Sequence, residues 1–177
     1  MRNIILIGPM GAGKSAIGRE LARRLDLAFF DADEVLQEKT GVDIALIFEL
    51  EGEAGFRRRE EMTLAELCKL NGAVIATGGG AVLSALNRER LRTGGTVVFL
   101  ETSVEWQVAR TRPGRQRPLL DTPDPRAKLA ALYEIREPLY RECAHLVVST
   151  DARHVNTVAG EIIERLRELD APCTNSS

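Results

Sequence analysis

A short apolar run meets a glycine-rich loop close to the N-terminus, and this junction constrains the fold more than any other feature of the chain. Residues 4–7 are all Ile or Leu, and they lead directly into the loop Gly8-Pro9-Met10-Gly11-Ala12-Gly13-Lys14-Ser15. A helical apolar pattern follows at once, with Ile17, Leu21 and Leu25 on one face. The pattern GxxxxGK[ST] between a buried strand and a helix is typical of a loop that binds the phosphates of a nucleoside triphosphate.

The residue types in this loop suit phosphate chemistry. Glycines let the backbone curl so that successive N–H groups point inward at phosphate oxygens. The helix that begins at the loop adds the positive end of its dipole. Lys14 supplies a positive charge for the outer phosphates, and the Ser15 hydroxyl is placed to ligate Mg²⁺. The sequence therefore predicts ATP-type binding here, but it leaves the acceptor open.

Four further short apolar runs alternate with amphipathic stretches along the chain. The runs cover residues 28–30, 73–76, 96–100 and 146–148, and each lacks strict alternation of apolar and polar residues. Strands that are buried on both faces have this composition, so the pattern predicts an α/β fold whose parallel sheet is covered on both sides. The length of 177 residues suits one domain, which we place at residues 1–169, followed by a short polar tail at 170–177.

Charge and cysteine content exclude several functional classes. The net charge of −2 argues against a nucleic-acid partner, whose binding would depend on phosphate neutralisation. Two histidines are too few for a His-rich metal site, and no apolar run is long enough to span a membrane. Three cysteines without paired spacing favour a reducing cytoplasm over a disulfide framework.

Residues 111–126, rich in proline and arginine, are either a solvated loop or a mobile lid that closes over an anion.

Carboxylates and glycines follow two of the apolar runs and are candidates for the acceptor side. Asp31 and Asp33 follow the second run, where two residues on one face of an extended segment would reach the ligand-binding edge of the sheet. Asp33 could alternatively cap the helix that starts at Glu34. The glycines at 78–80 follow the third run, either as a flexible turn or where the main chain passes close to a ligand.

Arginines supply the candidate anion-binding groups. Consecutive helical residues diverge by about 100°, so at most two of the arginines at 57–59 can face one site, and salt-bridged surface charge is expected for the rest and for Glu60. Pro138 is expected to break or kink a helix and so present Arg136 inward.

These motifs together resemble those of shikimate kinases. The resemblance runs from Arg2 to about Leu169 and rests on GPMGAGKSAIG, DADEVL, EGEAGFRRREE, ATGGGAV, ARTRPGRQRPLL and REPLYRE, in that order. It implies a three-layer α/β/α fold with a five-stranded parallel sheet and a mobile lid at about 111–126. It also implies transfer of phosphate from ATP to shikimate with Mg²⁺, in aromatic amino-acid biosynthesis, by a monomer.

The same resemblance assigns roles to individual residues. It implies that Lys14, Asp33 and Arg117 are catalytic. It also implies that Ser15 binds Mg²⁺ directly and that Asp31 contacts the ion through water. Ala16 departs from the Thr that many members carry, and Arg112 and Arg115 receive no role. ATP binding is implied for Gly11, Ala12, Gly13, Lys14, Ser15, Ala16, Arg110, Arg117 and Arg153, and shikimate binding for Asp33, Arg57, Gly78, Gly79, Gly80 and Arg136.

Phosphoryl transfer has a loose transition state, and an ordinary Asp pKa of about 3.9 makes a weak base. We therefore expect Asp33 to orient the attacking hydroxyl and to accept its proton late. The rival interpretations are a kinase for gluconate or a nucleoside monophosphate, a GTP-dependent switch and a catalytically inactive binding module. A GTP-dependent switch would need an NKxD-type motif to bind guanine, and this chain has none. A catalytically inactive module is disfavoured because the residues expected for catalysis are all present.

Overall fold

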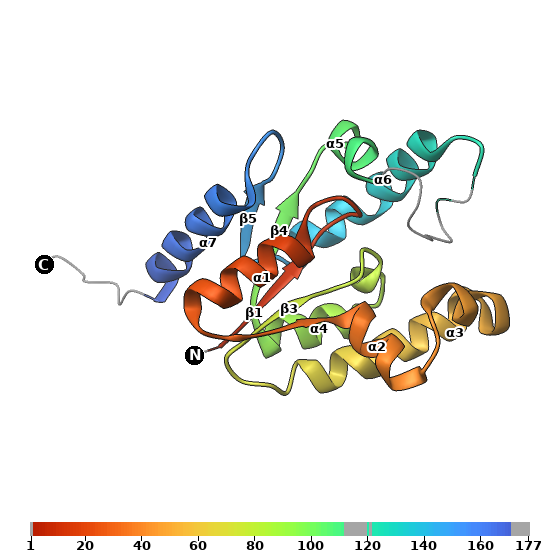
Figure 1. The fold of residues 1–177 in the computed structure, drawn as a ribbon, viewed down its shortest axis with the longest axis horizontal. Helices are drawn as coiled ribbons and strands as arrows, with labels where there is room; N and C mark the ends of the chain where they lie inside the picture. The colour runs from red at the N-terminus through yellow and green to blue at the C-terminus, as the bar shows by residue number, and fades with distance from the viewer. Residues whose placement is uncertain (1, 112–119, 121, 171–177) are drawn as a thin grey trace, which may run out of the picture.

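A five-stranded parallel sheet forms the centre of the molecule. The computed structural model describes residues 2–111, 120 and 122–170. The strands lie in the order β2-β3-β1-β4-β5, and every neighbouring pair is parallel (Figure 1). Their bounds are β1 Asn3–Ile7, β2 Ala28–Asp31, β3 Ala73–Ala76, β4 Gly95–Glu101 and β5 Leu146–Ser149. All five predicted strands are confirmed, with ends extended by one residue in β2, β4 and β5.

Helices cover both faces of the sheet, which confirms the three-layer prediction. One face carries α1 (Lys14–Leu25) and α7 (Val155–Asp170), and the other carries α3 (Ile44–Leu67), α4 (Ala85–Gly94) and α6 (Pro125–Cys143) (Figure 1). Strand β1 shows why, because Ile4 and Leu6 pack into one core cluster while Ile5 and Ile7 pack into the other. Successive side chains of a strand point to opposite faces, so a strand in the middle of such a sheet must be apolar throughout.

The remaining elements lie around the carboxyl ends of the strands. They are α2 (Ala32–Thr40), the short 3₁₀ helix η1 (Ala81–Leu83) and α5 (Val104–Arg110). Helix α2 and the first part of α3 share a small separate core of Leu36, Ile47 and Phe56. Helix α3 is interrupted at Gly52, whose φ of 68° and ψ of −175° suit only glycine. The interruption lets the first part of α3 turn toward α2.

Pro138 does not end helix α6, contrary to our expectation of a break or kink as the means of presenting Arg136. The helix continues through it to Cys143. Arg136 faces inward because it lies on the buried face of α6, in register with Leu129, Tyr140 and Cys143.

The predicted lid overlaps helix α6 at Pro125 and Arg126, and Pro125 is suited to a first helical turn because it lacks an N–H. At the other end of the chain, α7 runs to Asp170, so the first residue assigned to the tail is helical. Within the described ranges, no helix has the length and apolar character needed to cross a membrane.

Candidate active site

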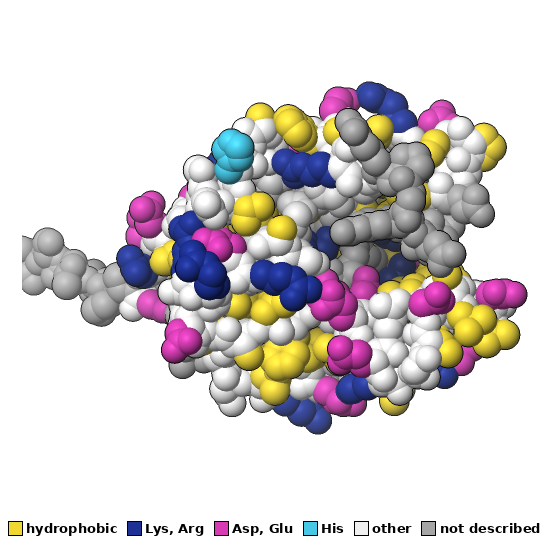
Figure 2. All heavy atoms as spheres, viewed as in Figure 1, with side chains coloured by type: hydrophobic (Ala, Val, Ile, Leu, Met, Phe, Trp, Pro, Cys, Tyr) yellow, Lys and Arg dark blue, Asp and Glu magenta, His cyan; other side chains and the backbone are white. Residues whose placement is uncertain are grey.

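Most of the predicted functional residues meet in one cleft at the carboxyl edge of the sheet. The cleft has a volume of about 850 Å³. A hollow is visible between the α2–α3 end and the α5–α6 end of the molecule (Figure 2). The lining residues include Gly11, Gly13, Lys14, Ser15, Ala16, Asp31, Asp33, Arg57, Glu60, Gly78, Gly79, Gly80, Arg110 and Arg136.

The glycine loop has the conformation that its sequence predicts. Gly11 and Gly13 adopt φ angles of 81° and 86°, and an L side chain would be strained at either position. Lys14 Nζ donates hydrogen bonds to the carbonyl oxygens of Gly8 at 2.7 Å and Pro9 at 2.8 Å, so the ammonium group lies over the loop. Ala12 differs from its neighbours, because its side chain is buried in the core beneath the loop.

Ser15 and Asp31 form a hydrogen-bonded pair of oxygen donors beside the loop. The Ser15 hydroxyl lies 2.5 Å from Asp31 Oδ2. A hydroxyl and a carboxylate are hard donors of the kind that Mg²⁺ prefers, and this ion usually keeps several waters and binds substrate phosphates as well. No cluster of three or more His, Cys, Asp or Glu side chains suited to a metal occurs in the described part of the chain. The pair therefore fits a cation held mainly by nucleotide and water.

Asp31, and not Asp33, is the cap of helix α2. Asp31 Oδ1 accepts hydrogen bonds from the backbone N–H groups of Asp33 at 3.0 Å and Glu34 at 3.5 Å. The expectation that the two aspartates share an extended segment is therefore wrong, because Asp33 already lies in the first turn of α2. Since Asp31 takes the capping role, the Asp33 side chain is available to the cleft.

The carboxyl group of Asp33 is an unusual acid. Burial, reinforced by the negative charges of Asp31 and Glu60, raises the pKa of Asp33 to about 6, while Lys14 and Arg57 oppose the shift. Our expectation of a weak base assumed an ordinary aspartate, and that assumption is wrong. A carboxylate with a pKa near 6 is a better proton acceptor at neutral pH than one with a pKa near 4.

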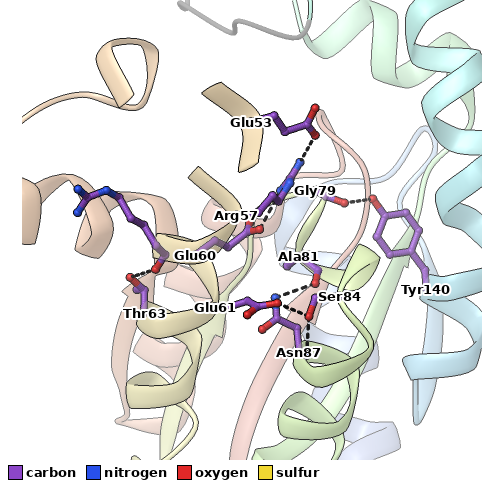
Figure 3. A network of polar contacts seen from close by, with 11 residues as sticks. Glu53, Arg57, Glu60, Glu61, Thr63, Gly79, Ala81, Ser84, Asn87 and Tyr140 are labelled. Atoms are coloured by element: carbon purple, nitrogen blue, oxygen red, sulfur yellow. Dashed lines mark hydrogen bonds and ion pairs between the residues drawn. The ribbon is translucent and has the colours of Figure 1, made fainter. Parts of the chain in front are cut away.

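Arg57 points toward the cleft and is held there by two glutamates. Its guanidinium lies 2.8 Å from Glu60 and 3.3 Å from Glu53 (Figure 3). Arg59 instead pairs with Glu51, as expected for the arginines that face away.

Glu60 is a site residue that we assigned to solvated surface charge, and this was wrong. Only 2% of its surface is exposed, and burial raises the pKa of its carboxyl group despite the nearby Arg57. Helical periodicity contains the missed signal, because Glu60 shares the buried face of Phe56, Thr63, Leu64 and Leu67.

The glycine run, residues 78–80, lies close to charged side-chain ends and has no positive φ angle. A Cβ atom at Gly80 would lie 2.3 Å from Arg57 Nη2, and one at Gly78 would lie 2.8 Å from Glu60 Oε1. Any side chain at either position would displace these charged groups. The run packs against the side chains of Arg57 and Glu60, and its approach to a ligand stays a prediction.

Arg136 brings a second guanidinium to the same glycines. It is 4% exposed, and a Cβ at Gly79 would lie 3.5 Å from its Nη1. Two guanidinium groups, Arg57 and Arg136, therefore flank the glycine run. A guanidinium can donate two parallel hydrogen bonds to one carboxylate, which a lysine cannot reproduce.

The other predicted ATP-binding arginines lie on the far side of the loop. Arg110 donates to the carbonyl oxygens of Gly11 at 3.1 Å and Thr150 at 2.7 Å. Arg153 donates to Ser149 and pairs with Glu161, close to Arg110 but outside the cleft lining. Arg117 lies outside the described residues, as do Arg112 and Arg115.

Three buried polar atoms in this cleft have no hydrogen-bond partner among the described residues. They are Asp33 Oδ1, Arg57 Nε and Glu60 Oε1. Buried polar atoms are nearly always paired, so their convergence indicates a polar ligand that completes them. With two guanidinium groups beside them and the phosphate loop opposite, the cleft suits a small hydroxylated carboxylic acid next to a nucleoside triphosphate.

Comparison with known proteins agrees with this chemistry. The sequence profile described as shikimate kinase matches residues 10–167. The shikimate kinase of Pseudomonas entomophila (strain L48) is 57% identical over 169 residues, which cover 96% of this chain and 98% of that protein.

Solved structures give the same result. The shikimate kinase from Acinetobacter baumannii in complex with shikimate superposes with a TM-score of 0.95 at 45% identity, covering 97% of this chain and 96% of that one. The enzyme from Aquifex aeolicus superposes with a TM-score of 0.83 at 34% identity, covering 95% and 98% of the two chains. The chain belongs to the shikimate kinase family.

Proposed function

We propose that this chain transfers the γ-phosphoryl group of ATP to the 3-hydroxyl of shikimate, producing shikimate 3-phosphate and ADP. The observation that carries the proposal is the convergence of unpaired buried atoms of Asp33, Arg57 and Glu60 beside the phosphate loop. Family membership supports it, and so does the bound shikimate in the Acinetobacter relative.

Arg57 and Arg136 bind the shikimate carboxylate in this proposal. Both guanidinium groups lie against the glycine run, and Gly78, Gly79 and Gly80 bring the main chain close to the ring of the substrate. Glu60 holds Arg57 in place through the 2.8 Å ion pair. The same pocket would accept gluconate only if its longer, open chain could reach both arginines and Asp33.

Asp33 orients the attacking hydroxyl and accepts its proton. With a pKa raised to about 6 by burial, the group is mostly ionised near pH 7.5 and can still take up a proton as the oxygen loses it. The positive charge of Lys14 lies on the opposite side of the reacting groups, over the loop that cradles the phosphates. Asp33 and Lys14 thus fix the acceptor and the donor from two sides.

ATP occupies the loop side of the cleft, where Gly11, Ala12, Gly13, Lys14, Ser15 and Ala16 surround its phosphates. Arg110 and Arg153 flank the base, and Arg117 is assigned to the phosphates from the sequence alone. Mg²⁺ is the divalent cation we assign to Ser15 and, through water, to Asp31, and it would neutralise phosphate charge. The hydroxyl–carboxylate pair supports this choice, since both are oxygen donors.

We assign the catalytic unit as a monomer, as the resemblance to shikimate kinases implies. Cys68 and Cys143 are free thiols, as expected in the reducing cytoplasm, where we place the enzyme. The net charge of −2 supports a small-molecule enzyme over a nucleic-acid binder.

The test is ADP release with Mg-ATP and a panel of shikimate, gluconate, AMP, CMP and no acceptor. We expect strong stimulation by shikimate alone, with shikimate 3-phosphate identified by ³¹P NMR. Turnover with gluconate or a nucleotide would overturn the acceptor assignment and leave the phosphate-loop assignment standing. ADP release that is independent of every acceptor would overturn the kinase assignment itself.

A further inference from the structure

Tyr140 is the largest buried side chain close to the substrate pocket that the proposed mechanism does not use. It lies on helix α6, one turn after Arg136, and only 1% of its surface is exposed. Its ring stacks on Phe99 of β4 with centroids 5.0 Å apart and planes inclined by 25°. The ring is therefore fixed by the core of the sheet, and its hydroxyl has a defined position.

The hydroxyl of Tyr140 is directed at the glycine run. It donates a hydrogen bond to the carbonyl oxygen of Gly79 at 2.5 Å (Figure 3). Burial raises the pKa of Tyr140 well above its ordinary value, so the hydroxyl keeps its donor proton at neutral pH. Because a peptide unit is planar and trans, the direction of the Gly79 carbonyl also sets the direction of the Gly80 N–H, which points away from Tyr140.

Gly79 needs such a fixed partner because a glycine restrains its own backbone less than any other residue. The neighbouring glycines are restrained by turn hydrogen bonds, from Ala81 N to the Gly78 carbonyl and from Leu83 N to the Gly80 carbonyl. The Tyr140 hydroxyl provides the equivalent restraint for Gly79.

The same hydroxyl is also linked to Arg136. The guanidinium of Arg136 favours the ionised form of Tyr140 through its charge and a side-chain hydrogen bond, in opposition to burial. Arg136 Nη1 would lie 3.5 Å from a Cβ at Gly79, so the arginine, the tyrosine hydroxyl and the glycine backbone form one contiguous group. Arg136 and Tyr140 are four residues apart on one helix face, which places both at the run.

We propose that Tyr140 is a positioning residue for the substrate pocket, which aligns the Gly79–Gly80 peptide and Arg136 for the acceptor through its hydroxyl. This inference rests on the proposed function, because it assigns Gly79, Gly80 and Arg136 to shikimate. It predicts a larger effect on the binding of shikimate than on that of ATP, since the hydroxyl of Tyr140 bonds to Gly79, and the phosphate loop is reached only through Gly79, where a Cβ would lie 3.6 Å from Gly8 O and Met10 N.

The test compares Tyr140→Phe with Tyr133→Phe. Both substitutions remove one phenolic oxygen from helix α6, but Tyr133 is half-buried, and it is the Tyr140 hydroxyl that donates to the carbonyl oxygen of Gly79. For Tyr140→Phe we expect the KM and the calorimetric Kd for shikimate to rise about tenfold, equivalent to about 1.4 kcal/mol. The KM for ATP and kcat should stay within about twofold, and Tyr133→Phe should match the parent enzyme in all three.

A folding defect is distinguished by measuring thermal unfolding and working about 15 °C below the lower transition, since 1 kcal/mol shifts the transition of a domain of this size by about 2–4 °C. Equal losses for ATP and shikimate, or an unchanged shikimate KM, would overturn the inference. The Gly80 amide resonance provides a second measurement, and it should shift in Tyr140→Phe and not in Tyr133→Phe. If the parent enzyme itself does not phosphorylate shikimate, the proposed function fails, whereas the Gly80 shift still tests the alignment.

Discussion

The carboxylate of Glu60 lies 2.8 Å from the guanidinium of Arg57 in the interior of the cleft, where only 2% of Glu60 is exposed. A buried ion pair of this kind is weak support for stability, because removing two charges from water costs about as much as their attraction returns. The ion pair matters here because it orients the side chain of Arg57. Glu60 fixes the direction of a long side chain that must meet a substrate carboxylate.

Glu60→Gln tests this geometric role. The amide keeps the size and one acceptor but removes the charge, so Arg57 should become less ordered and the KM for shikimate should rise about tenfold. We expect kcat and the KM for ATP to change by less than about threefold. Glu61→Gln is the matched control, because Glu61 is the next residue and bonds to Ser84 outside the cleft lining. An equal KM in the two variants would contradict the role assigned to Glu60.

The pH dependence of catalysis should report the carboxyl group of Asp33. Its pKa of about 6 means that the base becomes protonated as the pH falls through 6. We expect kcat/KM to fall about tenfold per pH unit below that value. Glu60 raises this pKa, so Glu60→Gln should move the acid limb to lower pH. Circular dichroism at each pH excludes unfolding, and an acid limb near pH 4 in the parent enzyme would show that Asp33 is not perturbed.

The raised pKa of Asp33 means that its ionised form should destabilise the folded protein at neutral pH. A carboxyl group whose pKa is raised from 3.8 when unfolded to about 6 when folded favours the folded state while it is protonated. That contribution is complete below pH 3.8 and is lost as the pH rises through about 6, and the difference is roughly 3 kcal/mol at most.

Asp33→Asn removes the ionisable group and should therefore raise the free energy of unfolding by about 1–3 kcal/mol at pH 7.5. The gain should shrink toward zero near pH 4, where the parent protein is protonated at this position. Activity should fall by at least about a hundredfold in the same variant. Urea unfolding at the two pH values, together with kcat, is the measurement, and near-normal kcat would remove Asp33 from the mechanism.

The sheet and the phosphate loop could be predicted because their residue patterns are local. A strand buried on both faces must be apolar throughout, as in Ile4–Ile7, and the glycine loop occupies consecutive positions. Site residues that depend on packing between distant elements are harder to predict. Glu60 resembles the other charges of helix α3 in the sequence, and only the face it shares with Phe56 and Leu64 places it in the interior.

The aspartates show a second limit. Two aspartates two residues apart were correctly assigned to the ligand edge, but which of them caps helix α2 depends on where β2 ends. The strand ends at Asp31 and the helix starts at Ala32, two residues earlier than expected, so Asp31 is the cap and Asp33 lies in the first turn. Its raised pKa arises from burial and from the charges of Asp31 and Glu60, and of these only the nearby Asp31 belongs to the local pattern.

Ser15→Ala should weaken the binding of Mg-ATP more than that of ATP alone. The hydroxyl lies 2.5 Å from Asp31, and its loss removes the direct oxygen ligand of the proposed metal site. We expect kcat/KM for Mg-ATP to fall by roughly a hundredfold, and Ser15→Thr, which retains the hydroxyl, to restore most of it. Titration calorimetry with and without Mg²⁺ separates the two effects. Equal affinities of the alanine variant and the parent for Mg-ATP would exclude Ser15 as a ligand.

Substitution of alanine for glycine should have opposite effects on stability at two helical positions, Gly18 and Gly160. A Cβ atom at Gly18 of α1 would lie 2.4 Å from Cε2 of Phe29, a side chain of β2 packed against the core. At Gly160 of α7 the nearest atom would be Arg24 Nη1, at an ordinary contact distance of 3.6 Å. Alanine favours a helix over glycine by about 1 kcal/mol, so only the clash at Gly18 can reverse the sign.

Gly160→Ala should therefore raise the free energy of unfolding by up to about 1 kcal/mol, while Gly18→Ala should lower it by about 1–3 kcal/mol because Phe29 must move. Urea unfolding of the two variants beside the parent protein gives both values. Helix α1 begins in the phosphate loop and β2 ends at Asp31, so displacement of Phe29 should also separate the Ser15–Asp31 pair. Gly18→Ala should consequently raise the KM for Mg-ATP, which Gly160→Ala should leave unchanged, and stabilisation by both substitutions would show that α1 does not pack this closely on β2.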